Sequence, residues 1–145
     1  MSLLSRKPTS TAPRAMRAVA RQRSQLAHDV DIRDHHLTAD EPEEEGGADE
    51  GPSPQELLAA SLASCTAITM EMYARRKGWN VDGLEVDCRF TPAERGCPTR
   101  FELLMRMPAH LSAEQVERLR VIAAKCPVHR TLEGEVAFDE RVELA

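Results

Sequence analysis

The chain has 145 residues, of which 41% are hydrophobic, and a net charge of −5. This length suits a single domain or one half of an intertwined dimer, and the acidic balance argues against nucleic acid as the main partner. No apolar stretch is expected to span a membrane or to act as a secretory signal. We therefore expect a cytoplasmic protein without a membrane partner, whose four cysteines are thiols.

Charge divides the N-terminal part of the chain. Six basic residues and no acid precede Asp29, whereas seven acids and no base lie between Asp40 and Glu50. We predict a disordered basic arm over residues 1–15, followed by a single domain over residues 16–145. Short alternations from Met16 to about Thr38 predict two or three strands. The Gly and Pro residues that follow predict a loop up to Pro54.

A long helix is predicted from Ser53 to Lys77. Ser53 is placed to cap it, Pro54 suits its first turn, and Glu56 occupies the capping-box position. One apolar face is formed by residues at spacings of three and four: Leu58, Leu62, Cys65, Ile68, Thr69 and Met72. At ~1.5 Å per residue the helix is about 36 Å long. A monomer of this size buries such a helix poorly, so we predict a homodimer.

A hairpin of two half-exposed strands is predicted next. Apolar and polar residues alternate from Val81 to Phe90 and again from Thr99 to Met107, with a turn over residues 91–98. Cys88 falls on the inward face of the first strand and is expected to be structural. Cys97 falls in the turn and is expected to be an exposed bystander.

The remaining sequence predicts a second helix and a closing strand. Ser112 caps the helix with Gln115 at the capping-box position, Cys126 lies on its inner face, and Pro127 ends it. Glu135 to Val142 alternates once more and predicts a strand. The order of elements is that of an α+β fold with both helices against sheet.

Several segments of this sequence resemble the OsmC-like branch of the OsmC/Ohr family, the osmotically inducible and organic hydroperoxide resistance proteins. The matching segments are Ala-Asp-Glu-Pro at 39–42, Gly-Gly-Ala-Asp at 46–49, Gly-Pro-Ser-Pro at 51–54, Glu-Leu-Leu at 56–58, Ser-Cys-Thr at 64–66, Tyr-Ala-Arg-Arg-Lys-Gly-Trp at 73–79 and Cys-Pro-Val-His-Arg-Thr-Leu at 126–132. The resemblance implies antiparallel sheets wrapped around long central helices in an intertwined homodimer, with each active site at the interface between subunits.

The resemblance also implies a thiol-dependent peroxidase that reduces organic hydroperoxides without a cofactor. Cys65 falls where the peroxide-attacking cysteine sits and becomes a sulfenic acid, which Cys126 resolves as a disulfide. A dithiol reductant, such as a lipoylated protein, then reopens the disulfide.

An activating cation is expected beside Cys65, because Cys65 lies in mid-helix and burial alone raises a thiol pKa. Relatives hold an arginine with a Glu directly after the Pro that opens the helix. Here that position is Gln55, and the carboxylate follows at Glu56. The candidate arginines are Arg17, Arg21, Arg23 and Arg33.

Three other interpretations stay open. The chain could be a thiol-redox sensor or small-molecule-binding protein without efficient turnover, or a structural dimer module whose basic arm binds an acidic partner. Taken alone, Cys65 is also compatible with a buried inert thiol. A zinc site is disfavoured because no two cysteines have the close spacing of zinc ligands; His129 is expected to pack within the site.

Overall fold

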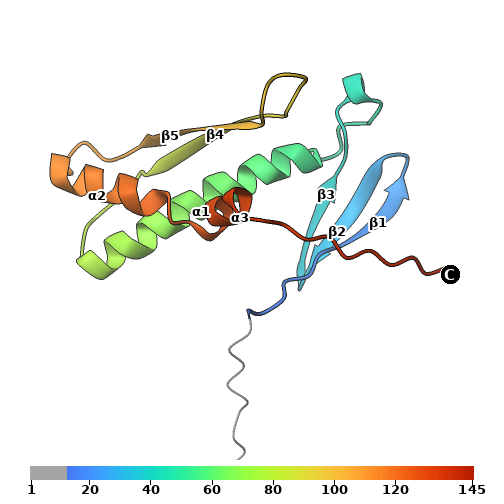
Figure 1. Ribbon diagram of the computed structural model, residues 1–145, viewed down its shortest axis with the longest axis horizontal. Helices are drawn as coiled ribbons and strands as arrows, with labels where there is room; N and C mark the ends of the chain where they lie inside the picture. The colour runs from blue at the N-terminus through green and yellow to red at the C-terminus, as the bar shows by residue number, and fades with distance from the viewer. Residues whose placement is uncertain (1–12) are drawn as a thin grey trace, which may run out of the picture. The chain divides into compact units, whose positions relative to one another are not determined.

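The computed structural model describes residues 13–145 (Figure 1). The chain forms two compact units and passes from the first to the second between Ser53 and Pro54. Most of the predicted basic arm, residues 1–15, lies outside the described residues. The single domain over residues 16–145 stays a prediction, and each unit is described by itself.

The first unit contains a three-stranded antiparallel sheet. Its strands β1 (Val19–Ser24), β2 (Ala27–Ile32) and β3 (His35–Ala39) are hydrogen-bonded in the order β1-β2-β3. Gln25 and Arg33 connect them in left-handed conformations, with φ of 52° and 54°, as tight hairpin turns require. The strands expected between Met16 and Thr38 are therefore confirmed.

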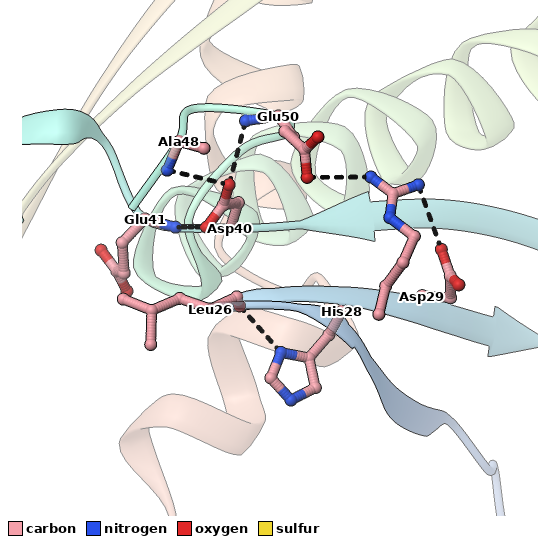
Figure 2. A network of polar contacts seen from close by, with 8 residues as sticks. Leu26, His28, Asp29, Asp40, Glu41, Ala48 and Glu50 are labelled. Atoms are coloured by element: carbon pink, nitrogen blue, oxygen red, sulfur yellow. Dashed lines mark hydrogen bonds and ion pairs between the residues drawn. The ribbon is translucent and has the colours of Figure 1, made fainter. Parts of the chain in front are cut away.

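The Asp40 loop (residues 40–53) follows β3 and is organised around one buried carboxylate. Asp40 is 2% exposed and accepts backbone N–H bonds from Glu41 at 2.8 Å, Ala48 at 3.2 Å and Glu50 at 3.1 Å (Figure 2). The hydrogen bond from the Glu50 amide is the main cause of a lowered Asp40 pKa. Three N–H donors thus fix the carboxylate as a charged anchor of the loop.

The second unit is built on the long helix α1 (Pro54–Lys77), which confirms the predicted helix. Its C-terminus is a Schellman motif: Gly78, at φ 72°, donates to Arg75 O at 3.1 Å, and Trp79 donates to Ala74 O at 2.9 Å. The strands β4 (Glu85–Thr91) and β5 (Arg100–Arg106) form the predicted antiparallel hairpin.

Two shorter helices complete this unit. Helix α2 (Ala113–Ala123) begins with the predicted capping box of Ser112 and Gln115, and α3 (Pro127–Glu133) follows it. Helix α1 contacts β4, α2 and α3 (Figure 1). The apolar core between these elements consists of Met70, Ala74, Val81, Leu119 and Ala123. Antiparallel strands together with packed helices confirm the α+β class.

The prediction for Cys126 and Pro127 was wrong. Helix α2 ends at Ala123, and Cys126 is instead the N-cap of α3, with Pro127 as the first helical residue. Proline is tolerated at that position because the first helical N–H has no partner within the helix and φ is already suitable. The same proline that was expected to stop one helix therefore starts another.

The predicted closing strand over Glu135–Val142 was also wrong. Residues 135–145 follow α3 without regular structure (Figure 1), and their apolar side chains are exposed: Val136, Phe138, Val142 and Leu144. An alternating pattern makes a strand only when a neighbouring strand pairs with its backbone. Within the described residues no strand pairs with this segment.

Helix α1 leaves part of its apolar surface uncovered. Ile68 is 54% and Met72 58% exposed. By length and composition alone α1 could cross a membrane, whereas no membrane-spanning stretch was predicted from the sequence. The core helix of a soluble protein has the same length and composition, so this property does not identify a membrane protein.

Candidate active site

Two cysteines that are 61 positions apart in the sequence come together in the second unit. Cys65 is half-buried on α1, and Cys126, at the N-cap of α3, has no exposed surface. The two side chains interact: besides burial, Cys126 contributes to the raised pKa of the Cys65 thiol. Neither cysteine is in a disulfide, so the structure presents a reduced dithiol.

The Cys126 sulfur is held by one backbone amide and one hydroxyl. The N–H of His129 donates to it at 3.3 Å, and the hydroxyl of Thr66 donates to it at 3.8 Å. The first bond is the side-chain cap of α3. The second bond comes from α1, because Thr66 is the residue after Cys65.

The Cys65 thiol has a raised pKa, chiefly because it is buried. A backbone hydrogen bond from Val128 lowers the pKa, but less than burial raises it. Cys126 raises the pKa further through a hydrogen bond and its charge, and a hydrogen bond with Thr69 lowers it. Cys65 is therefore mainly a thiol at neutral pH, and its nucleophile is the minor thiolate form.

Adjacent residues of α3 thus donate hydrogen bonds to the two cysteine sulfurs. Val128 and His129 are adjacent on α3, and their amides bond to Cys65 and Cys126 respectively. Thr66, Thr69 and Val128 were not among the site residues predicted from the sequence. Val128 acts through its backbone N–H, so the type of its side chain does not predict this role. Interpreting Pro127 as the first residue of a helix would have predicted the orientation of these amides.

His129 lies beside this pair. Its Nε2 is 2.8 Å from Glu133 Oε1, one turn later on α3. Its Nδ1 is buried and, among the described residues, has no hydrogen-bond partner. Because Glu133 accepts at Nε2, the neutral ring carries its proton there and keeps a lone pair at Nδ1.

An apolar groove of about 540 Å³ adjoins α3. Helix α1, the hairpin and α3 all contribute to its walls, which are formed by Leu58, Leu62, Phe90, Thr99, Phe101, Leu103, His129, Leu132 and Glu133. A groove lined mainly by such side chains suits the apolar body of an organic molecule.

The roles expected for Glu56 and for the candidate arginines stay predictions. Glu56 is in the first turn of α1, nine residues before Cys65, which is about 14 Å along a helix. Of the candidate arginines, Arg23 pairs with Asp29 at 3.4 Å and with Glu50 at 3.2 Å. Arg21 pairs with Asp31 at 2.6 Å.

The two remaining cysteines have different surroundings. Cys88 is half-buried on β4, and burial is the main cause of its raised pKa. Cys97 is exposed in the turn between β4 and β5. No cluster of three or more His, Cys, Asp or Glu that could hold a metal occurs within residues 13–145.

Comparison with known proteins agrees with the motifs around the dithiol. The family model for OsmC-like proteins matches residues 46–141, which include both cysteines. The chain belongs to the OsmC-like family. No curated protein matches this OsmC-like chain in sequence.

Solved structures share the OsmC-like fold. An OsmC-like protein from Mycoplasma pneumoniae superposes with a TM-score of 0.72 at 18% identity, covering 85% of this chain and 90% of the other. The Legionella pneumophila organic hydroperoxide resistance protein OsmC gives 0.64 at 19% identity, covering 86% and 93%. The Bacillus subtilis organic hydroperoxide resistance protein OhrB gives 0.58 at 20%, covering 83% and 91%.

Proposed function

We propose that this OsmC-like protein is a thiol-dependent peroxidase that reduces organic hydroperoxides. The observation that carries the proposal is that Cys65 of α1 and Cys126 of α3 come together, both reduced, with Cys126 acting on the pKa of the Cys65 thiol. A structural thiol does not need a second thiol within reach. Two structural neighbours named organic hydroperoxide resistance proteins add support.

The reaction follows from sulfur chemistry. The Cys65 thiolate attacks one peroxide oxygen, the O–O bond breaks, and the other oxygen leaves as the alcohol after taking up a proton. The resulting sulfenic acid condenses with the Cys126 thiol, which forms the disulfide and releases water. An external dithiol, for which a lipoylated protein is our candidate, reduces the disulfide by exchange.

Activation of Cys65 must overcome its raised pKa. The hydrogen bonds with Val128 and Thr69 contribute in the required direction. We propose that Glu56 orients an activating cation for Cys65. An arginine lowers a thiol pKa only where its charge lies close to the sulfur.

The groove beside α3 is our candidate for the substrate site. Leu62 on α1 and Phe90 and Phe101 on the hairpin give it an apolar surface. An alkyl hydroperoxide can bury its alkyl group in such a groove, whereas hydrogen peroxide has no apolar group to bury there. We therefore expect organic hydroperoxides to be the better substrates.

A homodimer is part of the proposal. The exposed Ile68 and Met72 lie one turn apart on α1, and burying them against a second chain is favourable. We place the protein in the cytoplasm, where its thiols stay reduced, and propose neither a nucleic-acid nor a membrane partner.

The test is consumption of tert-butyl hydroperoxide with dihydrolipoamide as the reductant. We expect turnover in the wild type, none in Cys65→Ser, and a persistent sulfenic acid in Cys126→Ser. Cys97→Ser is the control and should keep full activity. Peptide mapping of the oxidised wild type should find a Cys65–Cys126 disulfide. Failure of Cys65 to oxidise under excess peroxide would contradict the proposal.

A thiol-redox sensor or small-molecule-binding protein without efficient turnover is the second candidate. The raised Cys65 pKa favours it, because little thiolate is present at neutral pH. A sensor would oxidise once and then stall with dihydrolipoamide present. A binding protein would retain its ligand in Cys65→Ser. Sustained turnover excludes both.

A further inference from the structure

We propose that Thr66 is a catalytic residue for disulfide formation: its hydroxyl holds the Cys126 sulfur beside Cys65 and donates a hydrogen bond to the Cys126 thiolate. The inference rests on the proposed function for its chemical step. Its basis is the 3.8 Å hydrogen bond from Thr66 Oγ1 to Cys126 Sγ. Thr66 has no exposed surface, so no water competes for this hydroxyl.

The direction of the Thr66 hydroxyl is unlike that of its neighbours on α1. Ser61 donates to Leu58 O at 2.7 Å, and Ser64 donates to Ala60 O at 2.8 Å. Donation to a carbonyl of the preceding turn is the usual use of a hydroxyl within a helix. Thr66 instead bonds to a sulfur on another element, 60 residues away.

The position of Thr66 couples the two cysteines. Because it directly follows Cys65, α1 carries the peroxide-attacking thiol and, through the next side chain, the group that holds the resolving thiol. Threonine is branched at Cβ and has few rotamers. The hydroxyl is thus held at a fixed place relative to Cys65.

Donors at Cys126 matter because the sulfur is enclosed. Cys126 has no exposed surface, so water does not stabilise a thiolate there. Within the described residues, the donors that contact it are the Thr66 hydroxyl, the His129 amide and the Cys65 thiol. When Cys65 is a sulfenic acid, it no longer supplies the thiol proton. The Thr66 hydroxyl and the His129 amide then stabilise the Cys126 thiolate.

The step that Thr66 assists is balanced within the protein. Cys126 loses its proton, and its thiolate attacks the sulfur of the Cys65 sulfenic acid. The S–S bond forms as the S–O bond breaks, and the departing hydroxide takes up a proton to become water. No further oxidant is needed, because the peroxide has already oxidised Cys65.

The experiment separates disulfide formation from the peroxide step. Reduced protein is mixed with stoichiometric tert-butyl hydroperoxide, the Cys65 sulfenic acid is trapped with dimedone at timed intervals, and the disulfide is measured by intact mass. In Thr66→Val we expect sulfenic acid to form at the wild-type rate and the disulfide to form about tenfold more slowly at pH 7, as expected for a lost hydrogen bond to a charged group.

Two variants control for packing. Thr66→Ser keeps the hydroxyl and loses the methyl group, so its rate of disulfide formation should stay near that of the wild type. Ser61→Ala removes a hydroxyl that bonds within the same helix and should change neither step. A Thr66→Ser rate as slow as that of Thr66→Val would overturn the proposal and assign the effect to packing.

A second readout does not require peroxidase activity. Thiolate absorbance at 240 nm is followed against pH in Cys65→Ser and in Cys65→Ser combined with Thr66→Val, where Cys88 and Cys97 contribute equally. Loss of the hydroxyl should shift the thiolate absorbance at a fixed alkaline pH to a lower value. This shift would support the role of Thr66 even if the wild type consumes no peroxide, whereas identical titrations would overturn it.

Discussion

The Asp40 loop and the Cys65 site both direct backbone amides at an acidic side chain, with opposite effects on the pKa of that side chain. Asp40 accepts three amides and has a lowered pKa. Cys65 accepts one amide, from Val128, and has a raised pKa because burial outweighs the hydrogen bonds. Hydrogen bonding from backbone amides therefore accompanies a charged carboxylate at Asp40 and a protonated thiol at Cys65.

The difference comes from the acceptor and from the number of donors. Carboxylate oxygens form strong charge-assisted hydrogen bonds, whereas sulfur is a weak acceptor. Cys65 also has a second thiol beside it, which raises its pKa further. Three amide donors keep the Asp40 carboxylate charged, so that it anchors the loop. A single amide donor leaves Cys65 as a thiol whose protonation can still change during a reaction.

The largest loss of stability is expected at Gly47, where the Asp40 loop has no space for a side chain. A Cβ at Gly47 would lie 1.9 Å from Glu41 O and 2.9 Å from Asp40 Oδ1. Gly47→Ala must therefore displace the backbone that surrounds the carboxylate, at about 3 kcal/mol of unfolding free energy. Denaturant unfolding measures the loss.

Gly46→Ala is the matched control for this substitution. Gly46 has φ of 91° and open space around its Cβ position, so only the left-handed conformation disfavours alanine, by about 1 kcal/mol. Equal losses in the two variants would show that the crowding around Asp40 does not matter.

A smaller effect, with a defined pH dependence, is expected for Asp40→Asn. The folded pKa of Asp40 is lowered from 3.8, so its stabilising contribution is present above that pH and disappears as pH falls through the folded pKa. The stability difference between wild type and Asp40→Asn should thus be largest near neutral pH and shrink under acid. Denaturant unfolding from pH 7 downward measures it, with exposed Asp34→Asn as the control. A difference that is constant with pH would contradict a charged anchor.

The smallest effect is expected on the reactivity of the Cys65 thiol, and it tests why the pKa of this thiol is raised. Cys126 raises the Cys65 pKa through a hydrogen bond and its charge. Cys126→Ser should therefore move iodoacetamide labelling of Cys65 to lower pH and increase its rate several-fold below the titration midpoint. The Cys65 pKa stays raised, because burial remains. Labelling is read by peptide mass, and Cys97→Ser should leave the profile unchanged. An unchanged profile in Cys126→Ser would mean that the two thiols are not coupled.

Local patterns predicted much of the fold. The periodic apolar residues and the Ser53-Pro54 start identified α1, and alternation identified the β4–β5 hairpin. The motifs around Cys65 and Cys126 selected the two cysteines that the structure brings together. Each of these signals is contained in a few consecutive residues, which is why the sequence was sufficient.

The failures concern features that depend on distant partners. Pro127 is compatible with both the end and the start of a helix, and the packing of α3 against α1 accompanies the second choice. Residues 135–142 alternate like a strand, but no described strand pairs with them. The donors to the two sulfurs include the backbone amides of Val128 and His129, whose direction depends on the turn before α3.

By itself, the sequence determined that this chain has an α+β, OsmC-like fold with a long apolar helix and two candidate reactive cysteines. The tertiary structure decided how those cysteines are held: Cys126 as a helix cap, Thr66 as a donor from the facing helix, and Cys65 with a raised pKa. Residue spacing describes only one element at a time. Burial and hydrogen bonding at a sulfur depend on which elements meet there, and that depends on packing of the whole unit.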